Sequence, residues 1–245
     1  MNPDFDVCAL DYQSLSNKVS LSNRVNVHRK DLTIQKIAAL ARLELLAKHG
    51  GVWTDATVFC AVPLSNWLDD YLEGRFFAFR DPGPDRLMSN WFIAAEPDSI
   101  ILERLREGFL DFFVSNHFSN QNTKLGKMAL DFLGARWNTN PTSTVLWHSW
   151  LVRKVLRIYP YFIFHYTFNK LVLEDDECRR LWYGSRPFSA APAHRLQELS
   201  QQRGGIELAK RLIECQTTPM HKLDWRVDVT SGYWKATLQH LGALL

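Results

Sequence analysis

Residues 48–58 read KHGGVWTDATV, and the predicted fold is built outward from this stretch. Before it, apolar residues recur at three- and four-residue steps, which predicts a helix with one buried face. These residues are Ile34, Ile37, Ala38, Ala41 and Leu45. Gly50 can take the left-handed backbone that ends a helix, and Gly51 permits an abrupt change of direction. A buried strand then begins at Val52 and resumes at Val58, which places Asp55 in the turn between the two pieces.

The rest of the first half predicts a largely parallel sheet. Short apolar runs at residues 5–11, 76–80 and 90–95 are typical of strands, and the apolar spacing after Pro97 predicts a helix. Strands that alternate with helices favour a parallel α/β sheet, and such sheets bind ligands at the carboxyl ends of their strands. In that position we expect the Asp55 carboxylate to bind a cation, bind a sugar hydroxyl or cap the turn.

The second half is predicted to be helical. From about residue 118 onward, strand-like alternation becomes scarce and helical spacing dominates. The predicted helices span residues 124–133, 143–159, 175–182, 193–203, 206–216 and 233–244. We therefore divide the chain into an α/β core at residues 1–117 and a helical region at residues 118–245, packed together as a single compact unit.

The composition is that of a globular protein rich in aromatic residues. With 245 residues, of which 46% are hydrophobic, the chain can bury one substantial core. The net charge of +3 and the absence of a long Lys/Arg block argue against a nucleic-acid partner. The nine tryptophans are typical of a packed core, and also of surfaces that stack on sugars or meet lipid.

Cysteine usage and the first residues predict a cytoplasmic protein. The four cysteines are too scattered for a metal knuckle or a redox pair, and we expect Cys8 and Cys60 to be reduced core residues within apolar strands. The first residues lack the basic and apolar regions of a signal peptide. The longest apolar-aromatic run, at residues 155–168, is interrupted by Arg157 and His165 and is unable to span a bilayer.

Four segments, in this order, resemble the capsular polysaccharide synthesis proteins. They are RLELL at residues 42–46, HGGVWTDAT at 49–57, SNWFIAA at 89–95 and HKLDW at 221–225. That family consists of bacterial sugar transferases similar to glycosyltransferase family 32, and the resemblance covers roughly residues 30–240. It implies a GT-A-like fold for nucleotide-diphospho-sugars, with a mostly parallel sheet, a helical C-terminal region and the first strand–helix unit of the family missing. The α/β core would then bind the nucleotide sugar, and the helical region would complete the acceptor side.

The resemblance implies transfer of a sugar from a nucleotide-diphosphate sugar, a UDP-sugar, with retention at the anomeric carbon. The acceptor would be a bacterial surface glycan of the capsule or lipopolysaccharide type, free or linked to lipid. Enzymes of this fold hold Mn²⁺ or Mg²⁺ with an Asp-x-Asp turn, because hard oxygen ligands suit these cations. Here the turn is Asp55-Ala56-Thr57, so a hydroxyl replaces the second carboxylate. The resemblance implies Asp55 and His221 as metal ligands.

The remaining site residues also follow from the resemblance. Asp55 and Asn90 would act in catalysis, by positioning and by stabilising charge. The acceptor side would be contacted by Trp91 and His165. The donor diphosphate would be bound by Arg42, Asp55, Thr57 and Lys222. Relatives carry a Ser-Asp pair shortly before the arginine where this chain has Ala38 and Ala39, which leaves the identity of the donor open.

Each of these residues also has a structural interpretation. Asp55 can cap a turn, and His221 can be a satisfied polar residue. Lys222 can be a solvated surface charge, and Trp91 can belong to the core. Arg42 can be an exposed helix charge paired with Glu44 or a neighbour.

Basic and aromatic residues interleave between residues 147 and 162. This pattern is typical of a lipid-headgroup surface, which would suit peripheral contact with the inner face of the plasma membrane and a lipid-linked acceptor. It is also typical of a buried aromatic core with solvated charges. Two other functions therefore stay open: a degenerate, non-catalytic nucleotide- or sugar-binding module, and a membrane-peripheral subunit of a capsule assembly complex.

Overall fold

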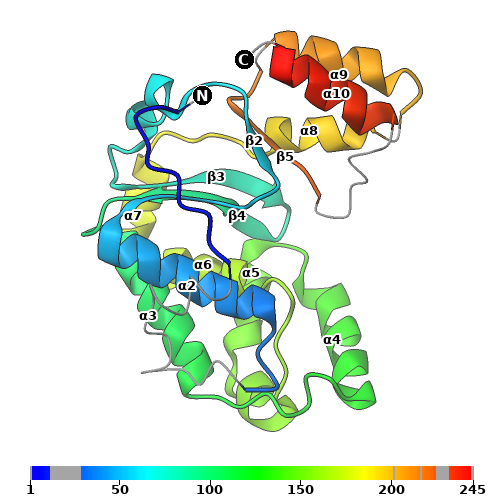
Figure 1. Cartoon of the computed structure of the whole chain (residues 1–245). Coiled ribbons are helices and arrows are strands. Elements are labelled where there is room, and N and C mark those ends of the chain that lie inside the picture. Colours follow the sequence, from blue (N-terminus) through cyan, green and yellow to red (C-terminus); the bar gives the residue numbers. More distant parts are fainter. Residues whose placement is uncertain (1, 12–28, 201, 216, 225–231, 244–245) are drawn as a thin grey trace.

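Figure 1 shows the protein as a computed structural model, which describes residues 2–11, 29–200, 202–215, 217–224 and 232–243. The fold is mixed α/β and mostly helical, with two small antiparallel sheets. The helices are α2 (Ile34–His49), α3 (Ile100–Val114), α4 (Lys124–Trp137), α5 (Pro141–Thr144), α6 (Ile163–Glu174), α7 (Asp176–Gly184), α8 (Ala191–Leu199), α9 (Gly205–Glu214) and α10 (Gly232–Ala243). The strands are β1 (Gly51–Thr54), β2 (Val58–Cys60), β3 (Phe76–Gly83), β4 (Arg86–Ala95) and β5 (Met220–Lys222).

The larger sheet has the order β1-β4-β3, and both of its strand pairs are antiparallel. Ile93 of β4 lies opposite Trp53 on one side and Ala78 on the other. The predicted parallel sheet is therefore wrong. A short turn joins β3 to β4, and such a hairpin forces the two strands to run in opposite directions. The sequence was misleading because β4 is buried on both faces and so reads as a continuous apolar run, which is typical of parallel strands.

Two hydrophobic clusters enclose this sheet (Figure 1). One face packs on α2, α3 and α6, which supply most of the largest buried cluster together with residues from α7 and the segment between α5 and α6. The other face carries an aromatic cluster that includes Trp67, Phe77, Phe79 and Phe92. Because side chains of β3 and β4 alternate between the two clusters, the sheet is a central layer that fixes the position of the turns at its ends.

The strand predicted at residues 5–11 is wrong. No strand is present among residues 2–11, and Cys8 is exposed while Cys60 is half-buried at the end of β2. Only Phe5 of this segment packs against the aromatic cluster. A short apolar run fits a strand only if a neighbouring strand offers its backbone groups, and this condition is not written in the run itself.

The helices between residues 141 and 174 differ from the prediction in two ways. The stretch predicted as one helix at 143–159 consists of α5, a 3₁₀ turn at Val145–His148 and a π-helical segment at Leu151–Leu156 that ends at Arg157 with a φ of 53°. Helix α6 was not predicted at all. Eight of its twelve residues are buried, including residues from all sides of the helix, so its sequence shows no amphipathic period.

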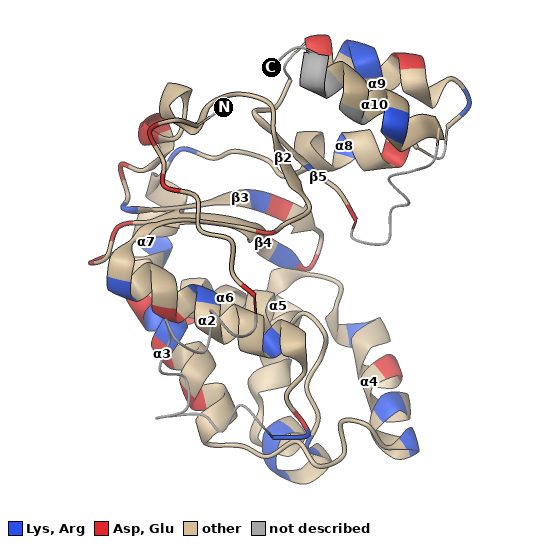
Figure 2. Cartoon of the chain, viewed as in Figure 1, with Lys and Arg blue, Asp and Glu red and all other residues tan. Residues whose placement is uncertain are grey.

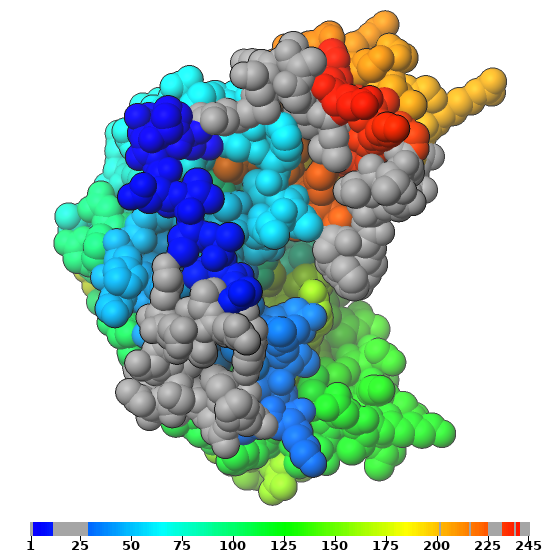
Figure 3. All heavy atoms as spheres, viewed as in Figure 1, coloured from blue at the N-terminus to red at the C-terminus, as the bar shows by residue number. Residues whose placement is uncertain are grey.

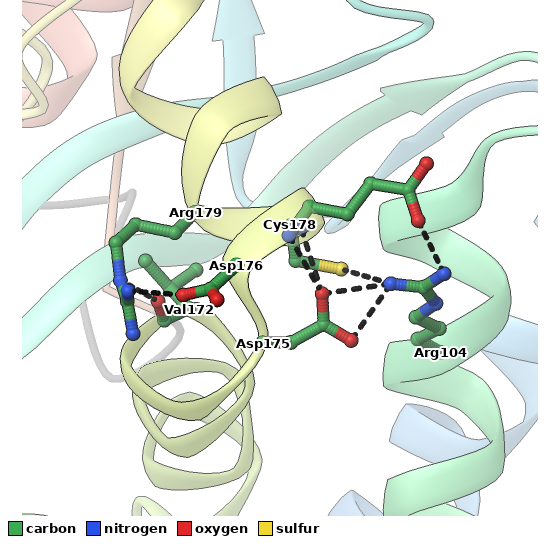
Figure 4. Close-up of polar contacts among 7 residues, drawn as sticks. Arg104, Val172, Asp175, Asp176, Cys178 and Arg179 are labelled. Atoms are coloured by element: carbon green, nitrogen blue, oxygen red, sulfur yellow. Dashed lines mark hydrogen bonds and ion pairs between the residues drawn. The ribbon is translucent and has the colours of Figure 1, made fainter.

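Helix α7 is tied to α3 by a polar contact at its first turn (Figure 4). The Asp175 carboxylate caps α7 by accepting hydrogen bonds from the backbone N–H groups of Glu177 and Cys178, at 3.1 and 2.9 Å. Arg104 of α3 donates to both oxygens of the same carboxylate, at 2.7 Å each, and also bonds Glu177. The backbone bond from Cys178, with the Arg104 charge, holds the pKa of Asp175 below its usual value. This carboxylate therefore stays ionised while it joins the two helices.

The predicted glycine stop after α2 is confirmed, and it provides a matched test of backbone strain. Gly50 has φ 64° and ψ −156°, a conformation available essentially to glycine alone, and an added Cβ would lie 2.7 Å from Cδ of Pro97. Gly51 also has a positive φ, of 87°, but an added Cβ would meet nothing within 4 Å.

We expect Gly50→Ala to lower the free energy of unfolding by about 2–4 kcal/mol, from strain and overpacking together, and Gly51→Ala to lower it by only about 1 kcal/mol. Urea denaturation of the two variants measures the difference. Equal losses would show that Pro97 moves aside without cost and that the close contact at Gly50 does not matter.

Candidate functional site

Asp55 lies in the turn that leaves the sheet after β1 and leads to β2. Its backbone N–H donates to the Trp91 carbonyl at 2.8 Å, and its own carbonyl accepts from Val58 at 3.0 Å, which closes the turn. Its carboxylate oxygen Oδ1 accepts from Nη2 of Arg42 and from Nε1 of Trp53, both at 3.1 Å. Backbone and side chain are therefore both fixed, and the carboxylate has one orientation.

Lys222 reaches the same turn from the other end of the chain. Strand β5 pairs with β2, with Lys222 opposite Val58, and the Leu223 N–H donates to the Thr57 carbonyl at 2.8 Å. The Lys222 ammonium donates to the Thr57 hydroxyl and lies 3.9 Å from Oδ2 of Asp55. The structure thus brings together the four side chains that were predicted to bind a diphosphate, namely Arg42, Asp55, Thr57 and Lys222.

Arg42 is a buried cation with unmet hydrogen-bonding capacity. The residue is 5% exposed, and its guanidinium lies over the rings of Trp53 and Phe164, with 4.9 and 5.5 Å to the ring centroids. Its Nη2 bonds Asp55, but Nε and Nη1 have no hydrogen-bond partner among the described residues. Burial lowers the Arg42 pKa to about 10, opposed by the Asp55 charge, so the group stays protonated at neutral pH. The exposed pairing with Glu44 does not occur, because Glu44 pairs with Arg106 at 3.2 Å.

Two further cations, which the sequence did not single out, contact the residues just before α6. Lys36 donates to the Tyr161 carbonyl, and its ammonium lies 5.2 Å from the centroid of the Tyr161 ring. The Arg86 guanidinium lies 4.0 Å from the centroid of the Phe162 ring and pairs with Asp85 at 3.0 Å. With Arg42 over Phe164, three cations contact residues 161–164. A period in the sequence could not reveal this group, because its members come from α2 and from the start of β4.

The buried residues of this cationic group have shifted pKa values. Burial lowers the Lys36 pKa to about 7, and no acidic side chain in the described ranges forms an ion pair with it. Burial, together with the charges of Arg86, Lys36 and Arg42, holds the His165 pKa well below its usual value. His165 Nδ1 has no hydrogen-bond partner within the described ranges. An anion that approached this group would meet unpaired donors and would favour protonated Lys36.

The other predicted site residues lie in different surroundings. His221 faces Phe59 across the β2–β5 pair, and Phe59 belongs to the cluster under α8, α9 and α10. Since side chains alternate along a strand, the His221 ring lies on the opposite face of this ribbon from Lys222. Burial lowers the His221 pKa to about 4, and neither ring nitrogen has a hydrogen-bond partner in the part of the chain that the structure describes.

Trp91 and Asn90 lie next to each other on β4 but differ in exposure. Trp91 is buried in the aromatic cluster, stacked on Phe79 with 4.7 Å between ring centroids and edge-on to His194. This is the core arrangement, in which its ring is not available to stack on a sugar. Asn90 is half-buried, and its side chain makes no hydrogen bond to a described residue. Its amide can therefore still bind a ligand.

The surroundings of Asp55 bear on the predicted metal site. Within the described ranges, no three His, Cys, Asp or Glu side chains come together as a metal-binding group. Asp55 itself faces the two cations Arg42 and Lys222, and His221 lies on the other face of the ribbon. These residues do not by themselves fit a divalent cation, so metal binding stays a prediction.

The surface near these elements is hollowed. Figure 3 shows an indentation beside the green segment that contains α4. Strand β5, in orange, reaches toward this indentation from one side (Figures 1 and 3). A ligand that bound here would lie between the helical segments of the second half of the chain.

Comparison with known families identifies the class of protein. Residues 1–122 match the family described as capsular polysaccharide synthesis protein, and through these residues the chain belongs to that family, which confirms the resemblance seen in the sequence. The match includes Arg42, Asp55, Thr57, Asn90 and Trp91, whereas His165 and the β5 residues lie beyond it. No curated protein and no solved structure matched the chain.

Proposed function

We propose that this protein is a glycosyltransferase that moves a sugar from a nucleotide-diphosphate sugar onto a bacterial surface glycan. Membership of a capsular polysaccharide synthesis family supports a glycan substrate. The observation that carries the proposal is the Asp55 turn, where a fixed carboxylate is held between Lys222 and a buried Arg42 whose Nε and Nη1 are unpaired. Unpaired buried donors beside a cationic group favour an anionic ligand, and a diphosphate is such a ligand.

The proposed chemistry relies on positioning and on charge. When the glycosidic bond of the donor breaks, negative charge builds up on the leaving diphosphate. Lys222, whose ammonium already bonds Thr57, would stabilise that charge at the β5 side, and Arg42 would do so from beneath the turn. Asp55 would accept a hydrogen bond from a sugar hydroxyl while keeping the two cations apart and oriented. Held groups of this kind lower the barrier because no reorganisation is needed during the reaction.

Three finer parts of the proposal rest on the family resemblance. They are a UDP-sugar as donor, retention at the anomeric carbon, and Asn90 as a group that binds a sugar hydroxyl. We nominate no side chain as a base, because a front-face reaction can use an oxygen of the leaving diphosphate to take the acceptor proton. His165, near the start of α6, is placed by the proposal on the acceptor side.

The proposal is tested by a screen of nucleotide sugars with and without Mn²⁺ or Mg²⁺, read as nucleotide release. We expect the wild type to release nucleotide from one donor and Asp55→Asn to do so at least about 100-fold more slowly, since a positioned electrostatic contact contributes about this much. Asp70→Asn is the matched control, because Asp70 is exposed and its nearest partner is Arg186 at 3.8 Å. Equal rates for the two variants would refute a role for Asp55. Chelation of the metal in the same assay tests the predicted cofactor.

A second candidate is a nucleotide- or sugar-binding module without catalysis. Two observations favour it: Asp55 is ion-paired rather than free, and Thr57 stands where the turn of GT-A enzymes has a second carboxylate. On this alternative, calorimetry would show that the wild type binds UDP while no donor in the screen is consumed. Release of nucleotide above the Asp55→Asn rate would exclude it.

A further inference from the structure

Helix α4 exposes an apolar stripe to solvent. Leu125, Met128 and Phe132 lie on one face at three- and four-residue steps, and all three are exposed, Leu125 at 77%. The opposite face packs on the main core through Leu130 and Leu133. A helix that already buries one apolar face has no structural need of a second one. Exposed apolar stripes of this kind mark surfaces that meet a partner.

A second exposed apolar stretch lies between α5 and α6. Its exposed residues include Trp150 at 67%, and the others are Leu146, Leu151 and Val155. Trp147, three residues before Trp150, is fully buried. The chain therefore turns some aromatic side chains inward and others to solvent. The predicted aromatic core at residues 147–162 therefore holds for only part of the segment.

The two stretches are held side by side at both ends. At one end, Asn120 donates through its side chain to the Leu156 carbonyl at 2.9 Å, while Gly126 of α4 packs directly on the Asn120 backbone. At the other end, the rings of Trp137 and Trp147 lie 5.2 Å apart. The exposed side chains of residues 124–157 therefore lie on adjoining segments, and we call them together the basic-apolar surface. These segments lie at the end of the molecule away from α9 and α10 (Figure 1).

The basic-apolar surface carries a net positive charge, whereas the rest of the chain does not. Residues 124–157 contain six Lys or Arg and one Asp, which gives 6 − 1 = +5. The whole chain carries +3, with 29 basic and 26 acidic residues, so the remainder has 23 basic and 25 acidic residues and a charge of −2. Five of the six cations are exposed and none forms an ion pair with a described acidic residue; they are Lys124, Lys127, Arg136, Lys154 and Arg157. Figure 2 shows these basic positions on α4 and at the adjoining end of the molecule.

We propose that the basic-apolar surface docks on a lipid bilayer that contains anionic headgroups. The cations would lie at the headgroups, and Trp150, Leu125 and Phe132 would enter the boundary with the acyl chains, which is the arrangement of interfacial amphipathic helices. A protein partner is less favoured, because protein interfaces are depleted in lysine, whereas lysine is abundant on this surface. The contact is peripheral, since the described helices include none with the length and apolar character needed to cross a membrane. The proposal does not depend on the glycosyltransferase activity.

Sedimentation with vesicles tests the charge part of the proposal. We expect the full-length protein to bind vesicles made of phosphatidylcholine and about one third phosphatidylglycerol. It should not bind vesicles made of phosphatidylcholine alone. Lys124→Gln combined with Lys127→Gln should weaken the partition coefficient about 30-fold, because each lysine near an anionic surface contributes about 1 kcal/mol. Lys48→Gln with Lys235→Gln is the matched control, since both residues are exposed on helices outside the surface.

The apolar part is tested separately. Phe132→Ser with Trp150→Ser should also release the protein from the anionic vesicles, while Tyr183→Ser, an exposed aromatic residue on α7, should not. Circular dichroism confirms that each variant is folded. The proposal would be overturned if the wild type did not bind anionic vesicles, or if the surface variants and the control variants bound them equally. It would also be overturned if the protein had no affinity for lipid and formed a dimer that Phe132→Ser dissociates. The last result would assign the surface to a second copy of the chain.

Discussion

Acidification from pH 7 to about 4.5 is expected to lower the free energy of unfolding by several kcal/mol, because four histidines have lowered pKa values in the folded protein. His165 and His221 are buried, and His148 and His194 are half-buried. Burial lowers the pKa of His148 to about 3 and of His221 to about 4, and it also lowers the pKa values of His165 and His194. In the unfolded chain these groups titrate near pH 6.5. Between pH 6.5 and 4 the unfolded chain therefore binds more protons than the folded protein, so stability is full above pH 6.5 and is lost as the pH falls.

The contribution of one histidine can be isolated with His221. A shift from 6.5 to about 4 corresponds to roughly 3 kcal/mol, lost progressively as the pH falls from about 6.5 to 4. Urea denaturation at a series of pH values should show that His221→Phe loses less stability on acidification than the wild type, because phenylalanine suits the buried site and carries no proton to bind. His49→Phe is the matched control, since His49 is exposed at the end of α2. If His221→Phe and the wild type lost stability equally between pH 6.5 and 4.5, His221 would have to be solvated in the folded protein.

Replacing Arg42 by Met is expected to separate folding from ligand binding. Two guanidinium nitrogens of Arg42 have no hydrogen-bond partner among the described residues, so burial of this group destabilises the folded state. An apolar side chain of similar length can keep the packing on Trp53 and Phe164. Asp55 would keep the bond from Trp53 and the nearby Lys222 charge. We therefore expect the free energy of unfolding to change by less than about 1 kcal/mol, or to rise.

On the proposed function, the same substitution should weaken binding of UDP about 100-fold, because charge-assisted hydrogen bonds contribute about 1.5–3 kcal/mol each and two donors would be lost. Isothermal titration calorimetry measures the affinity. Arg106→Met is the matched control: Arg106 is a half-buried arginine with an unpaired Nε, it pairs with Glu44, and it lies on α3 outside the site. A variant that lost several kcal/mol of stability, yet bound UDP as the wild type does, would make Arg42 a structural residue.

Local signals in the sequence predicted single elements well and their partners poorly. The apolar spacing of α2, its glycine stop and the strands on either side of Asp55 were all readable, because caps, turns and periods act over a few residues. The direction of the sheet was not readable, since it depends on which strands meet. Strand β5 has three residues, and the first seven residues of α6 are all buried, so neither shows a clear period. Each is defined by contacts with distant parts of the chain.

The site follows the same division. The Asp55 turn and Lys222 were found because the family resemblance linked two segments that are remote in sequence. Lys36 and Arg86 were missed, because each is an ordinary charge in its own segment. They meet the aromatic residues at the start of α6, Lys36 as a buried cation and Arg86 as a half-buried one, only when α6 packs on α2 and β4. Unsatisfied donors on a buried side chain, such as those of Arg42, are visible only in three dimensions.

Pairing of β2 with β5 has a consequence for synthesis of the protein on the ribosome. Val58 meets Lys222, so the two sides of the Asp55 turn are separated by 222 − 58 = 164 residues of chain. At ordinary elongation rates, roughly ten to thirty seconds pass between the emergence of the first partner and that of the second. During this interval the nascent chain carries β2 as an open strand edge, which could pair with a neighbouring chain. A strand of three residues is a poor template for such mispairing. The shortness of β2 therefore protects the nascent chain from aggregation until its C-terminal segment has been synthesised.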